Sequence, residues 1–336
     1  MVVRGENGRG KSNLLESIFF LAVAKSGRGA RDREIVRWDA DHFVISANLE
    51  RGSDPVNIRI AYDSRAQKKR VEVDETTLER LSDLIGQFNA VLFSPEDVDL
   101  VLREASERRR LLDILVSQSS KAYLADLENY RRILAQRNHL LRTQGWQLKT
   151  SATALVPWDH QLAEAGSRVI DQRVASLDRI KTPLKGLYDS ISPRGEVLDV
   201  VYRSPALSGG SDDVAGKLVD LMEEKRVDET KVGYSLVGPH RDHVIFNLDG
   251  HAVHKFGSKG QMKSVLLAWK LAEADFLKAQ TGFRPVLLMD DIFSELDDVR
   301  ANSVLDMIGE FGQCVLATAR DPDLELGGRG YESIDL

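Results

Sequence analysis

Apolar and polar residues follow two different rhythms along the chain. Between residues 43 and 73 they alternate one by one, a pattern typical of antiparallel strands. Over 98–192 the leucines recur instead at steps of three and four residues, which predicts a compact helical hairpin with a polar break at 143–157. A helical insertion therefore interrupts a region of strands.

Short apolar runs and single amphipathic helices account for most of the remaining chain. We expect strands at 1–4, 90–93, 286–289 and 314–318, and mainly strands at 232–254. We expect helices at 11–25, 214–228, 259–280 and 298–311. These patterns predict an α/β protein, a mixed sheet with central helices plus antiparallel strands, that carries an inserted helical lobe. Lobe I would comprise 1–97 and 233–336, and the mainly helical lobe II would comprise 98–232.

The composition narrows the class of protein. At 336 residues, with 42% hydrophobic and 29% charged residues, the chain has the size and balance of about two globular domains. The longest apolar run near the N-terminus, 18–24, is far shorter than the roughly 20 residues of a membrane helix, and no signal peptide is recognisable. The single cysteine, Cys314, forbids an internal disulfide and fits a reducing compartment. We therefore expect a cytoplasmic protein without a membrane partner.

The formal net charge of −6 argues weakly against a protein coated with nucleic acid, but local basic groups can still bind phosphates. The segment 65–70 carries four positive charges and no negative one, and further basic groups lie at 25–37 and 108–110. Each group is either a solvated face or a phosphate-binding surface. The predicted DNA-binding residues are Arg65, Lys68, Lys69 and Arg70.

The most informative motif begins at Gly5, where G-E-N-G-R-G-K-S fits the phosphate-loop pattern G-x-x-x-x-G-K-[ST]. Its glycines allow backbone N–H groups to turn towards phosphates, and the following helix adds the positive end of its dipole. Lys11 would neutralise the β- and γ-phosphates, and Ser12 would supply a hydroxyl ligand to Mg²⁺. The sequence thus predicts a nucleotide site at its start.

An acidic pair, Asp290 and Asp291, follows the apolar run 286–289 near the other end. A strand tipped by an aspartate can hold Mg²⁺, and the next acid can orient or deprotonate the attacking water. The alternative is that adjacent acids simply begin a loop, which the following S-E-L-D at 294–297 disfavours. Because 278 residues separate Lys11 from Asp290, the two ends of the chain must meet to form one site.

A third element, F-G-S-K-G-Q at 256–261, lies between these two motifs. Ser258 fits the N-cap of the next helix, whose first N–H groups and positive dipole end can face an anion. By itself this is merely a capped helix. Placed about thirty residues before an aspartate-tipped strand, it resembles the signature of ATP-binding-cassette (ABC) ATPases. In those proteins the capped helix of one subunit faces the γ-phosphate held by another, so ATP joins two heads.

Four histidines form two H-x-x-H pairs that could suggest a zinc site: His240, His243, His251 and His254. They fall in segments that we expect to be strands, where positions i and i+3 point to opposite faces. Strand or loop histidines are therefore the better interpretation.

The order of the motifs resembles the RecF family of recombination-repair ATPases, which is related to SMC heads. The resemblance spans nearly the whole chain. It rests on 5–13, L-F-S-P-E-D at 92–97, R-R-R-L-L-D at 108–113, Q-R-N at 136–138, G-P-H-R-D at 238–242, S-K-G-Q at 258–261 and D-D-I-F-S-E-L-D at 290–297.

The resemblance implies an ABC-type P-loop ATPase head that binds ATP and Mg²⁺, and it implies roles for particular residues. The cofactor-binding residues would be Gly5, Glu6, Asn7, Gly8, Arg9, Gly10, Lys11, Ser12, Asn13, Ser258, Lys259, Gly260, Gln261 and Thr318. Ser12, Asp290 and Glu96 would hold the metal, and Asp291, Glu96 and Lys11 would be catalytic. Related heads carry a γ-phosphate-sensing glutamine at the position of Glu96. They often carry a sensor histidine at that of Thr318, where a plain strand-end threonine is an equal alternative.

The resemblance also implies a function in DNA repair, recombination and replication. An ATP-dependent homodimer would bind gapped or double-stranded DNA and promote RecA loading with RecR and RecO, and weak, DNA-stimulated ATP hydrolysis would release the dimer. An architectural SMC-type protein would need coiled coils tens of nanometres long. A transporter ATPase would need cassette-length spacing and a membrane partner, and a P-loop kinase would not need 258–261.

Three features depart from the family's pattern. RecF proteins normally carry strands ahead of the phosphate loop, and only 1–4 precedes it here, so we expect the start to be truncated or wrongly assigned. The family's usual S-F-R is Ser26-Gly27-Arg28, and its usual second aspartate after Arg241-Asp242 is His243.

Overall fold

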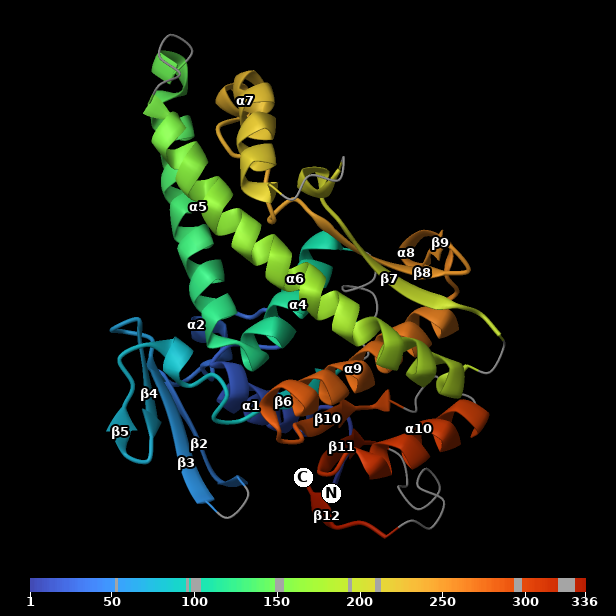
Figure 1. Cartoon of the computed structure of the whole chain (residues 1–336). Helices are drawn as coiled ribbons and strands as arrows, with labels where there is room; N and C mark the ends of the chain where they lie inside the picture. Colours follow the sequence, from blue (N-terminus) through green and yellow to red (C-terminus); the bar gives the residue numbers. More distant parts are fainter. Residues whose placement is uncertain are drawn as a thin grey trace. The chain divides into compact units, whose positions relative to one another are not determined.

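Two units make up the part of the chain that the structure describes. This computed structural model describes residues 1–51, 54–94, 97, 104–148, 154–192, 195–208, 213–292, 298–319 and 330–336 (Figure 1). Unit 1 comprises Met1–Arg103, Ile180–Asp199 and Asn247–Leu336, and unit 2 comprises Glu104–Arg179 and Val200–Phe246. The lobe boundaries expected at 97/98 and 232/233 stay a prediction.

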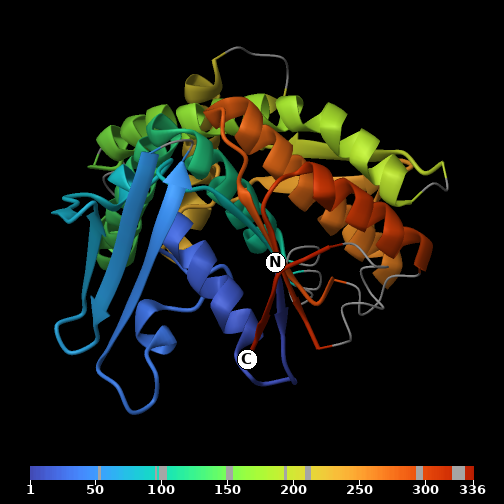
Figure 2. The ribbon, with the colours of Figure 1, turned by 90° about the horizontal axis from the view of Figure 1, so that it is seen from below.

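A five-stranded parallel sheet forms the centre of unit 1, in the order β12-β1-β11-β10-β6. Its strands are β1 (Val2–Arg4), β6 (Ala90–Phe93), β10 (Val286–Asp290), β11 (Cys314–Thr318) and β12 (Ser333–Asp335). The apolar runs of β1, β6, β10 and β11 fit strands covered on both faces, whereas the edge strand β12 is exposed. The first strand lies between two of the last strands, so the two ends of the chain do meet in one sheet (Figure 2).

The helix α1 (Lys11–Val23) packs against both sheets of unit 1. One of its sides contacts β6, β10 and β11 of the parallel sheet. Phe20 and Leu21 join Ile58, Ile60 and Val71 in a core with an antiparallel sheet in the order β2-β3-β4-β5. That sheet consists of β2 (His42–Arg51), β3 (Asp54–Asp63), β4 (Lys68–Val73) and β5 (Thr76–Thr77), which confirms the antiparallel strands predicted at 43–73.

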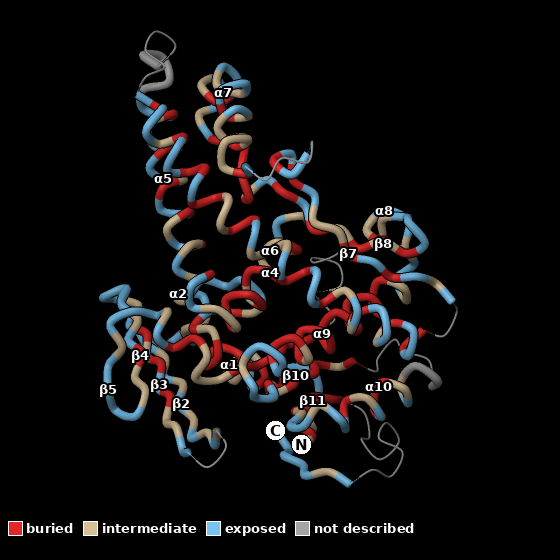
Figure 3. Tube along the Cα trace, in the orientation of Figure 1, coloured by how far each residue is buried: buried red, intermediate tan, exposed pale blue. Residues whose placement is uncertain are grey.

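The helix α9 (Lys259–Thr281) packs on β6 and is buried on every side from Met262 to Ala274 (Figure 3). Such burial is typical of a central helix. The other short elements of this unit are α2 (Asp32–Ile35), η1 (Leu81–Asp83), α8 (Val253–Phe256) and α10 (Asp298–Glu310). The mixed α/β architecture expected from the sequence is confirmed.

Unit 2 is mainly helical. Its elements are α4 (Ala105–Ser119), α5 (Lys121–Leu148), the first part of α6 (Val156–Ile191), η3 (Pro205–Leu207) and α7 (Val214–Val232). α5 packs on α4 and α7. The polar break predicted at 143–157 is wrong at both ends, since α5 continues to Leu148 and α6 begins at Val156. Pro157 lies in the first turn of α6, where a helix needs no N–H donor.

The prediction of mainly strands at 232–254 is also wrong in part. α7 extends to Val232 and ends at Gly233, whose φ of 76° suits a residue without a Cβ. The strands are limited to β8 (His243–Leu248) and β9 (His251–Ala252), which follow β7 (Leu198–Arg203) in a three-stranded sheet. His240 therefore lies in a turn and His254 in α8, so the strand argument against zinc does not hold for these two positions.

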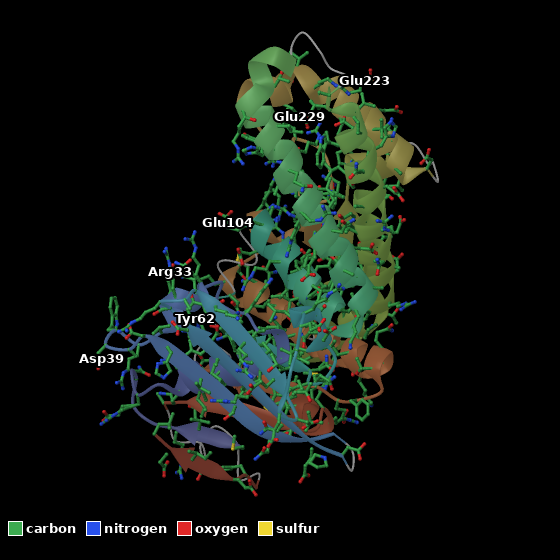
Figure 4. All side chains as sticks on the ribbon, turned by 90° about the vertical axis from the view of Figure 1, so that its left-hand side faces the viewer. Arg33, Asp39, Tyr62, Glu104, Glu223 and Glu229 are labelled. Carbon is green, nitrogen blue, oxygen red and sulfur yellow. The ribbon has the colours of Figure 1, made fainter. Side chains whose placement is uncertain are left out.

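Two arginines organise the interior of unit 2. The buried Arg137 donates to Asp159 Oδ1 (2.8 Å), Glu229 Oε2 (2.6 Å) and Ser235 Oγ (2.7 Å). Figure 4 shows Glu229 among the helices. The buried Arg173 donates to Asp113 Oδ1 (2.7 Å) and to the carbonyl oxygen of Pro239 (2.8 Å). The motifs R-R-R-L-L-D, Q-R-N and G-P-H-R-D thus contribute to a buried ionic network.

Candidate nucleotide-binding site

The phosphate-loop segment connects β1 to α1 through a turn that requires glycine. Gly8 and Gly10 have φ values of 86° and 102°, in the left-handed region that L side chains rarely adopt. Gly10 is also the N-cap of α1, so the first N–H groups of this helix lie at the loop. The local backbone therefore has the form that binds phosphate groups.

The side chain of Lys11 folds back onto this loop and bonds to its backbone. Its side chain is buried, at 8% exposure, and Nζ donates to the carbonyl oxygens of Gly5 (2.7 Å) and Glu6 (3.0 Å). These two bonds fix the ammonium group inside the loop. The arrangement supplies the positive charge that phosphate oxygens need.

A cavity of about 300 Å³ lies beside the loop. Its lining residues come from both ends of the chain: Asn7, Gly8, Gly10, Lys11, Ser12, Asn13, Ser94, Asp290, Asp291 and Ala319. The structure therefore brings the phosphate loop and the acidic pair together. Gly5, Glu6 and Arg9 belong to the same loop without lining the cavity.

Ser94 and Ala319 were missed by the sequence analysis. Each residue directly follows a parallel strand, β6 or β11, and carboxyl ends of parallel strands meet at one edge of a sheet. That rule would have found them if the strand order had been known. Thr318 is buried at the end of β11 and is not among the described residues that line the cavity.

The acidic pair occupies the end of β10. Asp290 is its last residue, and Asp290 Oδ2 lies 3.4 Å from Nη2 of Arg28. Asp291 has a φ of 45°, and its N–H donates to the carbonyl oxygen of Ala317 (3.0 Å). A left-handed backbone is uncommon outside glycine, although less so for aspartate, and such conformations cluster at functional sites.

Two predicted parts of the site cannot be placed. Glu96, assigned to the metal and to catalysis, lies outside the described residues. The same is true of S-E-L-D at 294–297, which the resemblance to the RecF family implies would line the interface of the dimer. Their roles stay predictions.

The predicted N-cap at Ser258 is confirmed. Ser258 Oγ accepts from the N–H of Gln261 (3.2 Å), while the N–H of Ser258 donates to Gln261 Oε1 (2.7 Å), which forms a capping box. Ser258 and Lys259 are exposed. None of the residues 258–261, all of them described, lines the cavity beside the phosphate loop.

The basic segment predicted to bind DNA lies on the turn between β3 and β4 and at the start of β4. Its members differ in their contacts. Arg65 pairs with Asp41, and Arg70 pairs with Glu72 (2.9 Å). Lys69 is only 11% exposed and pairs with Asp32 of α2 (2.7 Å). Lys68 is exposed.

Lys69 also donates to the carbonyl oxygen of Ala24 (2.6 Å) and lies over the ring of Phe20. Its charge therefore holds the segment that includes α2. In that segment Arg33 and Asp39 project outward (Figure 4). The DNA-binding assignment of the four residues stays a prediction. Among them, the contacts favour Lys68 as the DNA-binding residue, because the other three form ion pairs within the chain.

The basic group 108–110 is not a solvated face. Arg108 is buried and donates to the carbonyl oxygen of Val244 (2.6 Å), and Arg109 donates to that of Asp242 (2.8 Å). Arg110 pairs with Glu107 (3.1 Å). Two of these three arginines therefore hold the start of β8 inside unit 2.

The described residues contain no cluster of histidine, cysteine or acidic side chains suited to a metal ion. The side chain of His240 instead bonds with the hydroxyl of Tyr130 and, at 3.1 Å, with the carbonyl oxygen of Ser235. Desolvation lowers the pKa of His240 to about 4.

Within the described helices, none has the length and apolar character to cross a membrane.

The fold and the site together define a class. A parallel sheet with a phosphate loop and an aspartate-tipped strand at one edge, a flanking antiparallel sheet and a capped signature helix are the features of an ABC-type P-loop ATPase head. An Smc head bound to the C-winged helix domain of ScpA shares this fold, with a TM-score of 0.52 and 15% identity over 97% of this chain and 83% of that one.

Closer relatives identify the family. The DNA replication and repair protein RecF of Halothermothrix orenii is 34% identical over 333 residues, covering 94% of this chain and 85% of that protein. RecF of Chloroflexus aurantiacus is 37% identical, over 94% of this chain and 86% of its own length. A solved structure of the recombination mediator protein RecF–ATPrS in the RecFOR pathway has a TM-score of 0.87 and 29% identity, covering 100% of this chain and 89% of that one. No family model matches. The chain belongs to the RecF family of DNA replication and repair proteins.

Proposed function

We propose that this chain is an ATP-dependent DNA-binding protein of recombinational repair. It binds ATP with Mg²⁺, dimerises through the bound nucleotide and binds gapped or double-stranded DNA. It then promotes RecA loading together with RecR and RecO. Weak, DNA-stimulated hydrolysis releases the dimer. The observation that carries the proposal is the single cavity lined by the phosphate loop and by Asp290 and Asp291.

The residues of the cavity suit a nucleotide with its metal. Lys11 neutralises phosphate charge from a fixed position, and the N–H groups at the start of α1 bind phosphate oxygens. Ser12 and Asp290 offer the oxygen ligands that Mg²⁺ prefers. When bound, the metal supplies Lewis-acid neutralisation of the phosphate charge.

Hydrolysis requires a base for the attacking water. Asp291 lines the same cavity, and its backbone bond to Ala317 fixes its position at the end of β10. We assign it the role of orienting that water and accepting its proton. Glu96 and Thr318 remain candidate sensors, and the other residues of the phosphate loop bind the nucleotide.

The exposed start of α9 supports the dimer. Its capped N-terminus offers N–H groups and a positive dipole end to an anion, yet residues 258–261 are absent from the cavity of their own chain. The neighbouring Phe256 is 73% exposed. An exposed aromatic residue beside an anion-binding helix end suits a surface that a second copy covers.

The helical hairpin argues against an architectural SMC-type protein. α5 has 28 residues and α6 has 36, so at 1.5 Å per residue they extend roughly 42 and 54 Å. Each helix is therefore a few nanometres long, whereas the coiled coil of an architectural SMC-type protein is tens of nanometres long.

Sedimentation with and without ATP tests the proposal. At micromolar concentration the wild-type chain should shift from monomer to dimer when ATP and Mg²⁺ are added, and Lys11→Ala should remain a monomer. Lys11→Arg keeps the positive charge and serves as the matched control. Thermal denaturation of each variant shows whether it is still folded. A wild-type monomer at saturating ATP would contradict the dimer.

A further inference from the structure

Gln261 uses both the oxygen and the nitrogen of its side-chain amide within its own chain. Oε1 accepts from the N–H of Ser258 (2.7 Å), and Nε2 donates to Glu196 Oε1 (2.6 Å). Its backbone N–H in turn donates to Ser258 Oγ (3.2 Å). Both groups of the amide are therefore engaged, and the amide holds Ser258 in place.

Glu196 joins this capping box to a buried tyrosine. Its second oxygen, Oε2, accepts from the hydroxyl of Tyr188 (2.8 Å), a residue of α6 that is fully buried. The backbone next to Glu196 is fixed as well, because the N–H of Val197 donates to Asp249 Oδ1 (2.9 Å) and the N–H of Asp249 donates back to Val197 (3.0 Å). The carboxylate therefore has a fixed position between Tyr188 and Gln261, all within unit 1.

We propose that Glu196 is a positioning residue for the trans-acting start of α9. It orients the Gln261 amide so that the capping box closes, and the box aims the Ser258 hydroxyl and the first N–H groups of the helix at a γ-phosphate held by a second subunit. This inference rests on the proposed ATP-dependent dimer. It divides residues 258–261 into two roles: Ser258, Lys259 and Gly260 face the partner's nucleotide, and Gln261 positions them.

Loss of the carboxylate should act on the dimer and spare the subunit's own phosphate loop. In Glu196→Ala the Gln261 Nε2 loses its acceptor, the amide can turn, and Ser258 is no longer fixed. The cavity of the same chain is lined by other residues, so its contacts stay unchanged.

Two conservative variants separate positioning from simple stabilisation. In Glu196→Gln the amide oxygen still accepts from Gln261 Nε2, and its NH₂ group can donate to the oxygen of Tyr188. Tyr188→Phe removes one bond to the carboxylate while Gln261 keeps its partner. Glu196→Gln should therefore behave nearly as wild type, and Tyr188→Phe should lie between wild type and Glu196→Ala.

The first experiment measures nucleotide binding and turnover separately. Binding of a fluorescent ATP analogue to dilute, monomeric protein should change less than about two-fold in Glu196→Ala, whereas ATP-dependent dimer and turnover should fall about ten-fold, the range for a misaligned charge-assisted contact. A parallel loss of monomer binding and turnover, or a Glu196→Gln variant as impaired as Glu196→Ala, would overturn the assignment.

The second experiment mixes Glu196→Ala with Lys11→Ala. In a mixed dimer, the intact phosphate loop of the first variant meets the intact α9 start of the second, so one complete site forms. Turnover should rise well above that of either variant alone. No rise would mean that Glu196 acts within its own subunit. An ATP-induced dimer of Lys11→Ala alone would contradict the proposed function. An ATP-induced dimer of Glu196→Ala as stable as that of wild type would contradict the role of Glu196.

Discussion

Charged residues serve opposite purposes in the two units. In unit 1, Lys11, Asp290 and Asp291 line a cavity of about 300 Å³, drawn together from both ends of the chain. In unit 2, Arg137 and Arg173 fill the interior and bond to acidic side chains on neighbouring segments. Charges that line a cavity can contact a ligand even where they also pair within the chain, as Asp290 does with Arg28. Charges buried against each other hold the fold together. Substitutions at five positions test this difference between the two units.

Loss of Arg137 should destabilise the protein more than any of the other substitutions. Arg137→Ala removes the cation that the buried Asp159 and Glu229 share, while Asp159 keeps its pair with Arg226 (2.9 Å), and the free energy of unfolding should fall by about 3–5 kcal/mol. Denaturant unfolding measures this. Arg132→Ala on the exposed side of the same helix is the matched control, with an expected change of about 0.5 kcal/mol or less. Equal losses in the two variants would remove the distinction between the units.

Asp291→Asn should abolish turnover without affecting the fold. Asparagine tolerates the left-handed φ of 45° at this position but cannot accept the proton of water, so the rate of ATP hydrolysis should fall by about 10²–10⁴-fold. ATP-induced dimers should persist longer than in wild type, as sedimentation would show. Asp220→Asn, on the exposed surface of unit 2, serves as the control. Unchanged hydrolysis would exclude Asp291 as the base.

Lys68 and Lys69 should separate binding from stability within one basic segment. Lys68→Ala should weaken DNA binding and reduce the slope of log K against log salt by about 1. Lys69→Ala breaks the contacts to Asp32 and Ala24, and should lower the free energy of unfolding by about 1–2 kcal/mol. A salt titration and a denaturation curve for each variant are sufficient. Reversed effects would move the DNA contact to Lys69.

The smallest effect concerns two groups in unit 2 with opposed titrations. Burial raises the pKa of Asp242 from 3.8 to about 6, so the folded chain holds more protons there and stability falls as pH rises through this window. Burial lowers the pKa of His240 from 6.5 to about 4, so stability rises with pH over nearly the same window.

Asp242→Asn removes the contribution of Asp242, by which stability falls as pH rises, and leaves that of His240, by which stability rises with pH. The free energy of unfolding of the variant should rise between about pH 4 and pH 6.5, while that of the wild type should change less over the same range. Unfolding curves at several pH values measure this. Parallel curves for the two proteins would contradict the opposed titrations.

The phosphate loop could be predicted because its spacing encodes its mechanism. The positions of Gly8 and Gly10 and the burial of Lys11 follow from the local segment alone. The capping box at Ser258 is equally local, since its partner Gln261 is three residues away. The predicted N-cap at Ser258 was correct for that reason, whereas nucleotide binding by the loop stays a prediction.

Contacts between distant residues could be predicted only where both partners belong to a known motif, as Lys11 and Asp290 do. Nothing near Lys69 or Arg108 indicates that Asp32 and the carbonyl of Val244 will engage them. Ser94 and Ala319 required the order of the parallel strands, which a single sequence does not contain. Glu196 was missed because its contact with Gln261 joins positions 65 residues apart.

If two copies of this chain complete one another's nucleotide site, mixing two inactive variants should restore activity. Lys11→Ala impairs the phosphate loop and Ser258→Arg blocks the exposed start of α9, so each variant alone should hydrolyse ATP at background. An equal mixture should form one intact site in each mixed dimer and recover about a quarter of the wild-type rate, as expected for a symmetric dimer with independent sites. A mixture that stays at background while both variants remain folded would contradict a site shared between two copies.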